Sequence, residues 1–403
     1  MHAVGESMSR RLVEPAVTLE RVKPFFSEMG LTRINNQTGL DRLGIPVVSV
    51  CRPNARSNAV CQGKGLTLEA AKTSGVMESI ETYCAENILL PLHYASQRQI
   101  SRKHRIPDFA KLSRVAGSGL TLDTRLFWIE GREVSSEASC LVPLELVRAD
   151  FTVPYLSGTG HFVMSTNGLA SGNSYSEAVL HGLCEVIERD AMTLANLNLR
   201  GQKSLRVNLD TVDNPVAKDL IAQLTARSAL VAAWNITTDI SVAAFKCQIM
   251  DDDNGGATAN LLAEGYGCHP NRSVALLRAI TEAAQSRLTA IAGSRDDIAA
   301  DLYDGMEDHG DMDQWRRYLR EPNGGFDYQH IPHSEQGSTQ EELDHVLANL
   351  SHAGFGEAIV VDISAFPSEV CSVVRVIVLG LEGSMHPHFV PGARAGQIMG
   401  RHQ

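Results

Sequence analysis

The sequence lacks the features that are typical of zinc-binding, disulfide-rich, secreted and membrane-spanning proteins. Its eight cysteines form no CxxC pair, so the sequence predicts neither a zinc knuckle nor a disulfide framework. The N-terminus has no continuous apolar stretch of the signal-peptide kind, and no window approaches the roughly 18 apolar residues of a membrane-spanning helix. We therefore expect a cytoplasmic protein without a membrane partner.

Positive charge is also scarce. The chain has 36 lysine and arginine residues against 47 aspartate and glutamate residues, which gives a formal net charge of −11. This balance argues against sequence-independent nucleic-acid binding, which needs a basic face to neutralise phosphates. Any polyphosphate must instead be held locally, by metal ions or by a few cationic side chains.

The pattern of the 403 residues predicts a chain in which strands alternate with Ala-rich helices. We expect strands at residues 44–53, 240–250, 357–364 and 371–381. The run DDDNGG at 251–256 is typical of a hairpin turn, because Asp, Asn and Gly tolerate a left-handed backbone. A calcium loop is the alternative, but the spacing of the acids does not fit one.

We expect one composite domain, because no low-complexity linker divides the chain. Its expected parts are an N-terminal segment at 1–58 that is integral to the fold, a main domain at 59–384 and a tail at 385–403. Within the main domain, the polar and acidic segment 301–345 is typical of a surface insertion.

Three helical segments, at 67–82, 174–189 and 271–286, align without gaps. In each, a good N-cap residue is followed four positions later by alanine, and seven positions after that by glutamate. The aligned residues are Thr67, Ser174 and Asn271, then Ala71, Ala178 and Ala275, then Glu78, Glu185 and Glu282. A glycine-rich stretch precedes each segment, so the pattern predicts a strand-loop-helix unit used three times.

Two of these helices place acids one turn apart, Glu78 with Glu81 and Glu185 with Glu188. Such like-charged pairs destabilise a helix by about 0.2–0.5 kcal/mol each unless something compensates. Solvent is the ordinary compensation. A divalent metal ion is the alternative, because converging carboxylates supply the hard oxygen ligands that Mg²⁺ prefers. Recurrence at the same register favours the metal.

A carboxylate cluster of this kind indicates a nucleotide, because bound Mg²⁺ usually completes its shell with water and phosphate oxygens. The cations available to the phosphates are Lys64, Arg189, Arg278 and Arg287. The run QGKGL lacks the spacing of a Walker P-loop. Glu177 fits a capping box with Ser174 as well as it fits a ligand, and His181 is more typical of a packed histidine.

Three runs of sequence match motifs of a known family. They are QGKGLTLEAAKTSGVMESIETY at 62–83, TNGLASGNSYSEAVLHGLCEVIERDA at 166–191 and RSVALLRAITEAAQSR at 272–287. The second closely resembles the signature of the YcaO family, and the other two resemble its upstream and third motifs. The flanking runs at 38–53 and 374–383 resemble the stand-alone subgroup that is commonly encoded beside a TfuA-type partner.

The resemblance implies an α+β fold in which repeated strand-loop-helix units pack helices on mixed or antiparallel sheets around a central site for ATP and Mg²⁺. It implies an enzyme that phosphorylates a peptide backbone amide oxygen and needs no protein nucleophile. By the same resemblance, the metal ligands are Glu78, Glu81, Glu185 and Glu188. The expected nucleotide contacts are Arg11, Thr18, Lys64, Ser74, Asn173, Glu177, Arg189, Arg278, Glu282 and Gln285.

Three positions depart from the family pattern, and the last of them bears on the product. Thr82 stands where an arginine is usual, Leu379 stands where a proline is usual, and the tail lacks the PxPxP ending of many azoline-forming members. We therefore expect a thioamide, formed with sulfide or a sulfur donor and a TfuA-like partner. Azoline or macroamidine formation in a ribosomally made peptide stays open, as do a non-catalytic role in ribosomal-protein methylthiolation and a homodimeric assembly.

Overall fold

The computed structural model describes residues 11–198, 205–253, 261–295, 309–321, 324–383 and 390–400. The chain forms two compact units, each built from segments that are distant in sequence. The first unit comprises Met1–Asn54, Asn58–Glu78 and Leu199–Glu335, and the second comprises Ala55–Ser57, Ser79–Asn198 and Gln336–Gln403.

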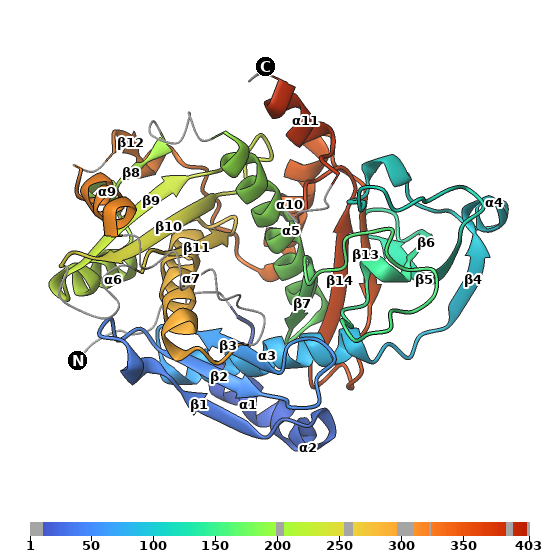
Figure 1. Ribbon diagram of the computed structural model, residues 1–403, viewed down its shortest axis with the longest axis horizontal. Helices are drawn as coiled ribbons and strands as arrows, with labels where there is room; N and C mark the ends of the chain where they lie inside the picture. Colours follow the sequence, from blue (N-terminus) through green and yellow to red (C-terminus); the bar gives the residue numbers. More distant parts are fainter. Residues whose placement is uncertain are drawn as a thin grey trace. The chain divides into compact units, whose positions relative to one another are not determined.

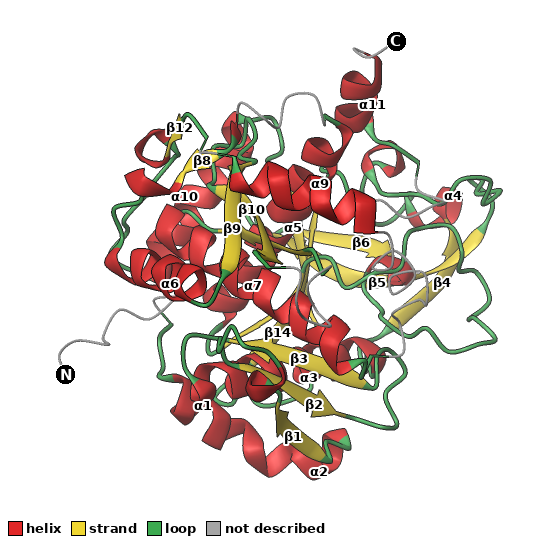
Figure 2. Cartoon of the chain, turned by 60° about the vertical axis from the view of Figure 1, so that its left-hand side comes forward, coloured by secondary structure: helices red, strands yellow, loops and turns green. Residues whose placement is uncertain are grey.

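The first unit contains two three-stranded antiparallel sheets. One has the order β1 (Arg33–Asn36), β2 (Val47–Cys51) and β3 (Val60–Lys64), preceded in the chain by α1 (Pro15–Val22) and α2 (Phe26–Met29) (Figure 2). The other has the order β11 (Ala263–Cys268), β10 (Ala244–Asp251) and β9 (Ala229–Asn235). Helix α7 (Arg272–Ala292) packs on β10 and β11, and α6 (Pro215–Ala226) packs on β9 (Figure 1).

The second unit is built on a six-stranded antiparallel sheet. Its order is β4 (Leu92–Ser96), β5 (Arg125–Glu133), β13 (Ala358–Asp362), β14 (Ser372–Val378) and β7 (Leu169–Gly172), and β6 (Ser139–Pro143) also pairs with β5. Helix α5 (Tyr175–Leu197) packs on β7 and β14. The remaining helices are α4 (Gln97–Ile100), α10 (Thr339–His352) and α11 (Ala393–Gly400), and the last two pack on α5.

The four strands expected from the sequence are confirmed as β2, β10, β13 and β14, with ends that differ by a few residues. The α+β fold class is confirmed as well, because helices pack on sheets that are antiparallel apart from one short parallel pair. The turn expected at 251–256 lies partly outside the described residues. The strands on either side of it, β10 and β11, pair as antiparallel neighbours.

The three predicted strand-loop-helix units are present. They are β3 followed by α3 (Leu68–Glu86), β7 followed by α5, and β11 followed by α7. Each expected N-cap side chain accepts a backbone N–H of its first turn: Thr67 from Ala70, Ser174 from Glu177, and Asn271 from Ser273 and Val274. These bonds satisfy amides that would otherwise have no partner, which is why the helices begin where the cap residues stand.

The aligned alanines mark where each helix approaches the strand before it. A Cβ atom on Gly63 would lie 2.0 Å from Ala71 O, one on Gly172 would lie 2.5 Å from Ala178 N, and one on Gly267 would lie 2.1 Å from Ala275 O. No side chain fits at those distances. The repeat therefore encodes a strand glycine in contact with the helix backbone at the first turns.

The segment 301–345 is not the surface insertion that its composition predicts. Residues 301–308 lie outside the described part of the chain, but α9 (His309–Arg320) packs on β9, and β12 (Phe326–Asp327) pairs with β8 (Val207–Asn208). Tyr328 and Ile331 belong to the hydrophobic core of the first unit, together with residues such as Phe245 and Leu276. A few apolar side chains anchor this polar segment, and average composition does not detect them.

The expected tail at 385–403 also has a fixed part. Glu382 accepts the N–H groups of Gly392 and Ala395 at the start of α11, at 3.0 and 2.7 Å. Asp190, which is fully buried, accepts Nε of Arg394 at 3.0 Å. Burial raises the pKa of Asp190 to about 6. The acid that ends the ERD run of the second motif therefore holds the C-terminal helix.

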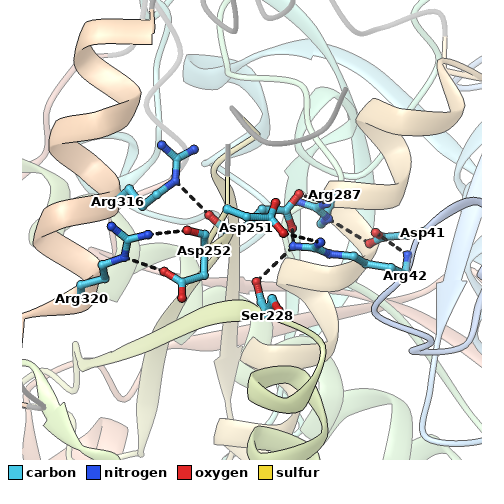
Figure 3. Close-up of polar contacts among 9 residues, drawn as sticks. Asp41, Arg42, Ser228, Asp251, Asp252, Arg287, Arg316 and Arg320 are labelled. Carbon is cyan, nitrogen blue, oxygen red and sulfur yellow. Dashed lines mark hydrogen bonds and ion pairs between the residues drawn. The ribbon is translucent and has the colours of Figure 1, made fainter. Parts of the chain in front are cut away.

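A buried ion-pair network in the first unit accounts for Arg287 (Figure 3). Its guanidinium, 0% exposed, pairs with Asp41 and with Asp251 at 2.9 Å each. Arg42 pairs with the second oxygen of Asp251 at 2.9 Å, and Arg316 donates to the Asp251 carbonyl at 3.1 Å. Arg287 therefore forms ion pairs with two acids inside the first unit, and the structure does not support the phosphate contact suggested by the sequence.

Within the described residues, no helix is both long and apolar enough to cross a bilayer.

We expect Gly267→Ala to destabilise the first unit by about 1–3 kcal/mol, because the new Cβ overlaps the backbone of α7. The measurement is the free energy of unfolding from urea denaturation. Gly39→Ala is the matched control, because nothing lies within 4 Å of the added atom. Equal stability of the two variants would show that the strand and helix are not held at this distance.

We expect Arg287→Ala to cost about 3–5 kcal/mol, because two buried carboxylates lose its guanidinium and only one of them, Asp251, keeps another cation, Arg42. Arg320→Ala removes an exposed pair, with 51% of the arginine side chain accessible, and should cost at most about 1 kcal/mol. Urea denaturation of both variants measures the difference. A loss no larger for Arg287 than for Arg320 would contradict the structural role of the network.

Candidate functional site

In the first unit, the site residues expected from the sequence gather around β3 and α7. Lys64 Nζ on β3 donates to Glu282 Oε2 on α7, and Tyr266 N on β11 donates to Glu282 Oε1 at 3.3 Å. Gln285 Nε2 donates to the carbonyl of Gln62 at 2.8 Å. Three of the predicted residues, Lys64, Glu282 and Gln285, are therefore close neighbours.

The other predicted residues of the first unit lie on α1, α3 and α7, apart from Arg11, which precedes α1. The Thr73 hydroxyl donates to Pro15 O at 2.8 Å, which joins α3 to the start of α1, the helix that carries the buried Thr18. Arg278 Nη1 donates to Cys268 O at 3.4 Å. Arg11, Ser74 and Glu78 are half-buried.

In the second unit, backbone and hydroxyl donors hold two of the predicted acids. Ser171 on β7 donates both its N–H, at 2.8 Å, and its hydroxyl, at 2.6 Å, to Glu81 Oε1. Asn173 N donates to Glu177 Oε2 at 2.8 Å. Ser174 caps the helix as predicted, but Glu177 reaches back to Asn173 and not to Ser174, so the capping box is displaced by one residue.

The predicted acids of α5, which are Glu177, Glu185 and Glu188, form an acidic stripe along the helix. Glu185 lies 4.0 Å from Arg189 Nε, one turn further along the helix. Glu188 is only 8% exposed. A carboxylate this far from water needs donors or a cation near it, because an isolated buried charge is strongly unfavourable. The stripe is therefore not an ordinary solvated helix face.

Sequence reasoning missed two residues beside these acids. Ser171 is the partner of Glu81, and Arg375 on β14 is a buried cation whose charge acts on Glu185. Arg375 stands inside the apolar run VRVIVLGL, and a charged residue within a strand that is otherwise apolar on both faces was the available signal. Ser171 stands in a glycine-rich stretch and gave none.

The donor set has the chemistry that Mg²⁺ requires. It consists of carboxylate oxygens and lacks the thiolates and imidazoles that suit zinc. Across the residues that the structure describes, no three His, Cys, Asp or Glu side chains converge tightly enough to hold a metal ion by themselves.

Residues 62–382 match the family model of the YcaO cyclodehydratases, which is described as ATP- and Mg²⁺-binding. The chain belongs to the YcaO family. It is 37% identical over 391 residues to a protein encoded in the tfuA 3′ region of Rhizobium leguminosarum bv. trifolii, covering 96% of this chain and 92% of that protein. The family expected from the three motifs is thereby confirmed.

Solved structures of YcaO proteins share the fold. A heterocyclase in complex with substrate and cofactor superposes with a TM-score of 0.75 at 19% identity over 95% of this YcaO chain, which spans 55% of that longer protein. The YcaO protein of Methanopyrus kandleri, bound with AMPPCP and Mg²⁺, gives a TM-score of 0.72 at 22% identity over 94% of each chain. At these identities the likeness establishes the fold alone.

Two family departures have structural explanations in this YcaO chain. The Thr82 hydroxyl donates to Ser79 O of its own helix at 3.1 Å. Threonine is uncharged, so this position lacks the positive charge of the arginine that is usual in the family. Leu379 packs in the hydrophobic cluster that includes Trp128 and Phe162. The Leu379 side chain fills a position in the hydrophobic core, and an apolar residue other than proline can fill that position well.

The two roles of Glu177 left open by the sequence are separable by substitution. We expect Glu177→Ala to cost about 1–2 kcal/mol of stability, because Asn173 N loses its acceptor at the helix start. Glu177→Gln keeps an acceptor oxygen and should lose less than about half of that. If Gln is as stable as the original but weakens Mg²⁺·ATP binding in calorimetry, the acid serves the nucleotide as well as the helix.

Proposed function

We propose that this chain binds ATP and Mg²⁺ and activates a peptide backbone amide by phosphorylating its oxygen, to give a thioamide. The observation that carries the proposal is the recurrence of a carboxylate at the same turn of three helices that start in the same way. The family match, to a model described as ATP- and Mg²⁺-binding, supports it. So does the likeness of fold to a YcaO protein solved with AMPPCP and Mg²⁺.

Glu78, Glu81, Glu185 and Glu188 are the proposed holders of Mg²⁺. Bound there, the metal ions would neutralise the charge that builds up on the phosphates during transfer. Lys64, Arg189 and Arg278 are the proposed phosphate contacts, and Arg11, Thr18, Ser74, Asn173, Glu177, Glu282 and Gln285 the remaining contacts of the nucleotide or its metals. Lys64 already has Glu282 as a partner, which holds its ammonium in place on β3.

The proposed reaction needs ATP because an amide oxygen is a poor leaving group. Sulfide, free or from a donor, adds to the carbonyl carbon, and the resulting oxyanion attacks the γ-phosphorus of ATP and releases ADP. The carbon–oxygen bond then breaks, inorganic phosphate leaves with that oxygen, and the carbon–sulfur double bond forms. The chain has to position the two substrates and neutralise charge, so no protein nucleophile is required.

A thioamide is favoured over a cyclised product by gene context, because the relative that is 37% identical is encoded beside tfuA. We propose a TfuA-like protein as the partner on that basis. Cyclodehydration is the alternative, in which a Cys, Ser, Thr or amine of the substrate attacks the same carbonyl and water is lost. In an accessory role without catalysis, the chain would bind nucleotide through the same acids but would release no phosphate.

Calorimetry tests the nucleotide site. We expect wild type to bind ATP only when Mg²⁺ is present, and Glu188→Gln to weaken that binding about tenfold or more, because one negative charge is lost beside the metal. Glu357→Gln, an exposed acid that pairs with Lys111, is the control and should bind as wild type does. Absence of Mg²⁺-dependent binding in wild type would overturn the proposed function.

Mass spectrometry tests the reaction. Peptides from cells that carry the gene with its tfuA-like neighbour are compared with peptides from cells that carry Glu188→Gln in its place. We expect a backbone mass gain of about 16 Da in one peptide, from exchange of oxygen for sulfur, which exact mass separates from oxidation. Loss of water in place of that gain would indicate cyclodehydration, and ATP binding without any changed peptide would indicate an accessory role.

A further inference from the structure

A buried arginine of the second unit has hydrogen-bond donors without acceptors. Arg375 on β14 is 3% exposed, and its Nη2 donates to the Ser165 carbonyl at 2.7 Å. Its Nε and Nη1 atoms, both shielded from water, have no hydrogen-bond partner among the described residues. A guanidinium carries five N–H donors and keeps its charge in proteins, so Arg375 is a buried cation that the described part of the chain satisfies only in part.

Another buried arginine shows what a structural role requires. Arg206, 4% exposed in the first unit, donates from Nη1 to Tyr318 O at 2.9 Å and from Nη2 to Leu319 O at 2.7 Å. Its guanidinium also lies over the rings of Trp234 and Tyr318. Arg206 therefore has two acceptors and two aromatic faces, whereas Arg375 has a single acceptor among the residues that the structure describes.

The strand register places Arg375 on the same face of the sheet as Ser171, the serine that holds Glu81. Arg375 pairs with Leu169, and Val373 pairs with Ser171. Val376 contacts Gly182 of α5, so alternation along β14 puts Arg375 on the opposite face of the sheet, the face on which the Ser171 hydroxyl holds Glu81. The charge of Glu185, another proposed metal ligand, acts on the guanidinium.

A second orphan atom lies on the same segment of chain. Asn167 Oδ1 is buried and has no hydrogen-bond partner among the described residues, and Asn167 is two residues from the Ser165 carbonyl that Arg375 contacts. Such an oxygen suits Mg²⁺ or one of its water molecules. An anion and its metal would satisfy both orphans together, the guanidinium through a phosphate oxygen and the amide oxygen through the metal or its water.

We propose that Arg375 binds the terminal phosphate of ATP and holds that group while it passes to the amide oxygen. The inference rests on the proposed function and extends it to a residue outside the three repeats. Burial decides which phosphate. The side chains of Lys64 and Arg189 are 20% and 34% exposed, whereas Arg375 is out of contact with water. The transferred group is the one that must be kept from water, because otherwise ATP would be hydrolysed.

The test compares affinities for Mg²⁺·ATP and Mg²⁺·ADP by calorimetry. We expect Arg375→Met to weaken Mg²⁺·ATP about 10–100-fold, since a charge-assisted hydrogen bond is lost, and to leave Mg²⁺·ADP within about threefold of wild type. Arg375→Lys keeps the positive charge but lacks the planar guanidinium, so its affinity for Mg²⁺·ATP should lie between those of wild type and Arg375→Met. Arg206→Met is the matched control and should keep both affinities.

Thermal unfolding of the ligand-free proteins gives a readout that does not depend on nucleotide. Arg375→Met should melt at or above the wild-type temperature, because it replaces a partly satisfied buried charge by an apolar side chain, whereas Arg206→Met should melt lower. An unchanged ATP-to-ADP affinity ratio in both Arg375 variants overturns this inference and leaves the proposed function standing. Wild type that binds neither nucleotide overturns both.

Discussion

The contact between a strand glycine and the helix that follows it is the constraint on which the site residues depend. Gly63, Gly172 and Gly267 each face the backbone beside the aligned alanine of the next helix. The aligned glutamate stands seven residues after that alanine, which is almost two full turns, so both point to the same side of the helix. Fixing the alanine against the strand therefore also fixes the direction of Glu78, Glu185 and Glu282.

The partners of the acids separate two kinds of carboxylate in this chain. Asp41 and Asp251 are matched by the guanidinium groups of Arg287 and Arg42, so their charge is cancelled and their role is to hold elements together. Glu81 and Glu177 accept hydrogen bonds from Ser171 and Asn173, and these bonds orient the two carboxylates. An oriented carboxylate suits the role of metal ligand that we propose for Glu81.

The helices that carry the proposed site were predictable because their signals are local. In each repeat, the N-cap, the alanine and the acid belong to one helix. The structure confirms the three helices that they predicted. Tyr328 and Ile331 show why the segment 301–345 was not predictable, since two buried apolar residues outweigh the polar residues around them. Arg287 was predicted as a phosphate contact because its sequence neighbours are site residues, but its partners Asp41 and Asp251 come from other parts of the chain.

By itself, the sequence determined the repeat, the family and the positions of the acids, because each depends on spacing within a few turns of one helix. Only the tertiary structure decided which segments form each unit and which acids receive neutral donors. It alone showed that Arg375 is buried with unsatisfied donors, through a contact with Ser165 that spans 210 residues of sequence. The physical reason is that burial and strand pairing join residues far apart in the chain, and local periodicity carries no record of those partners.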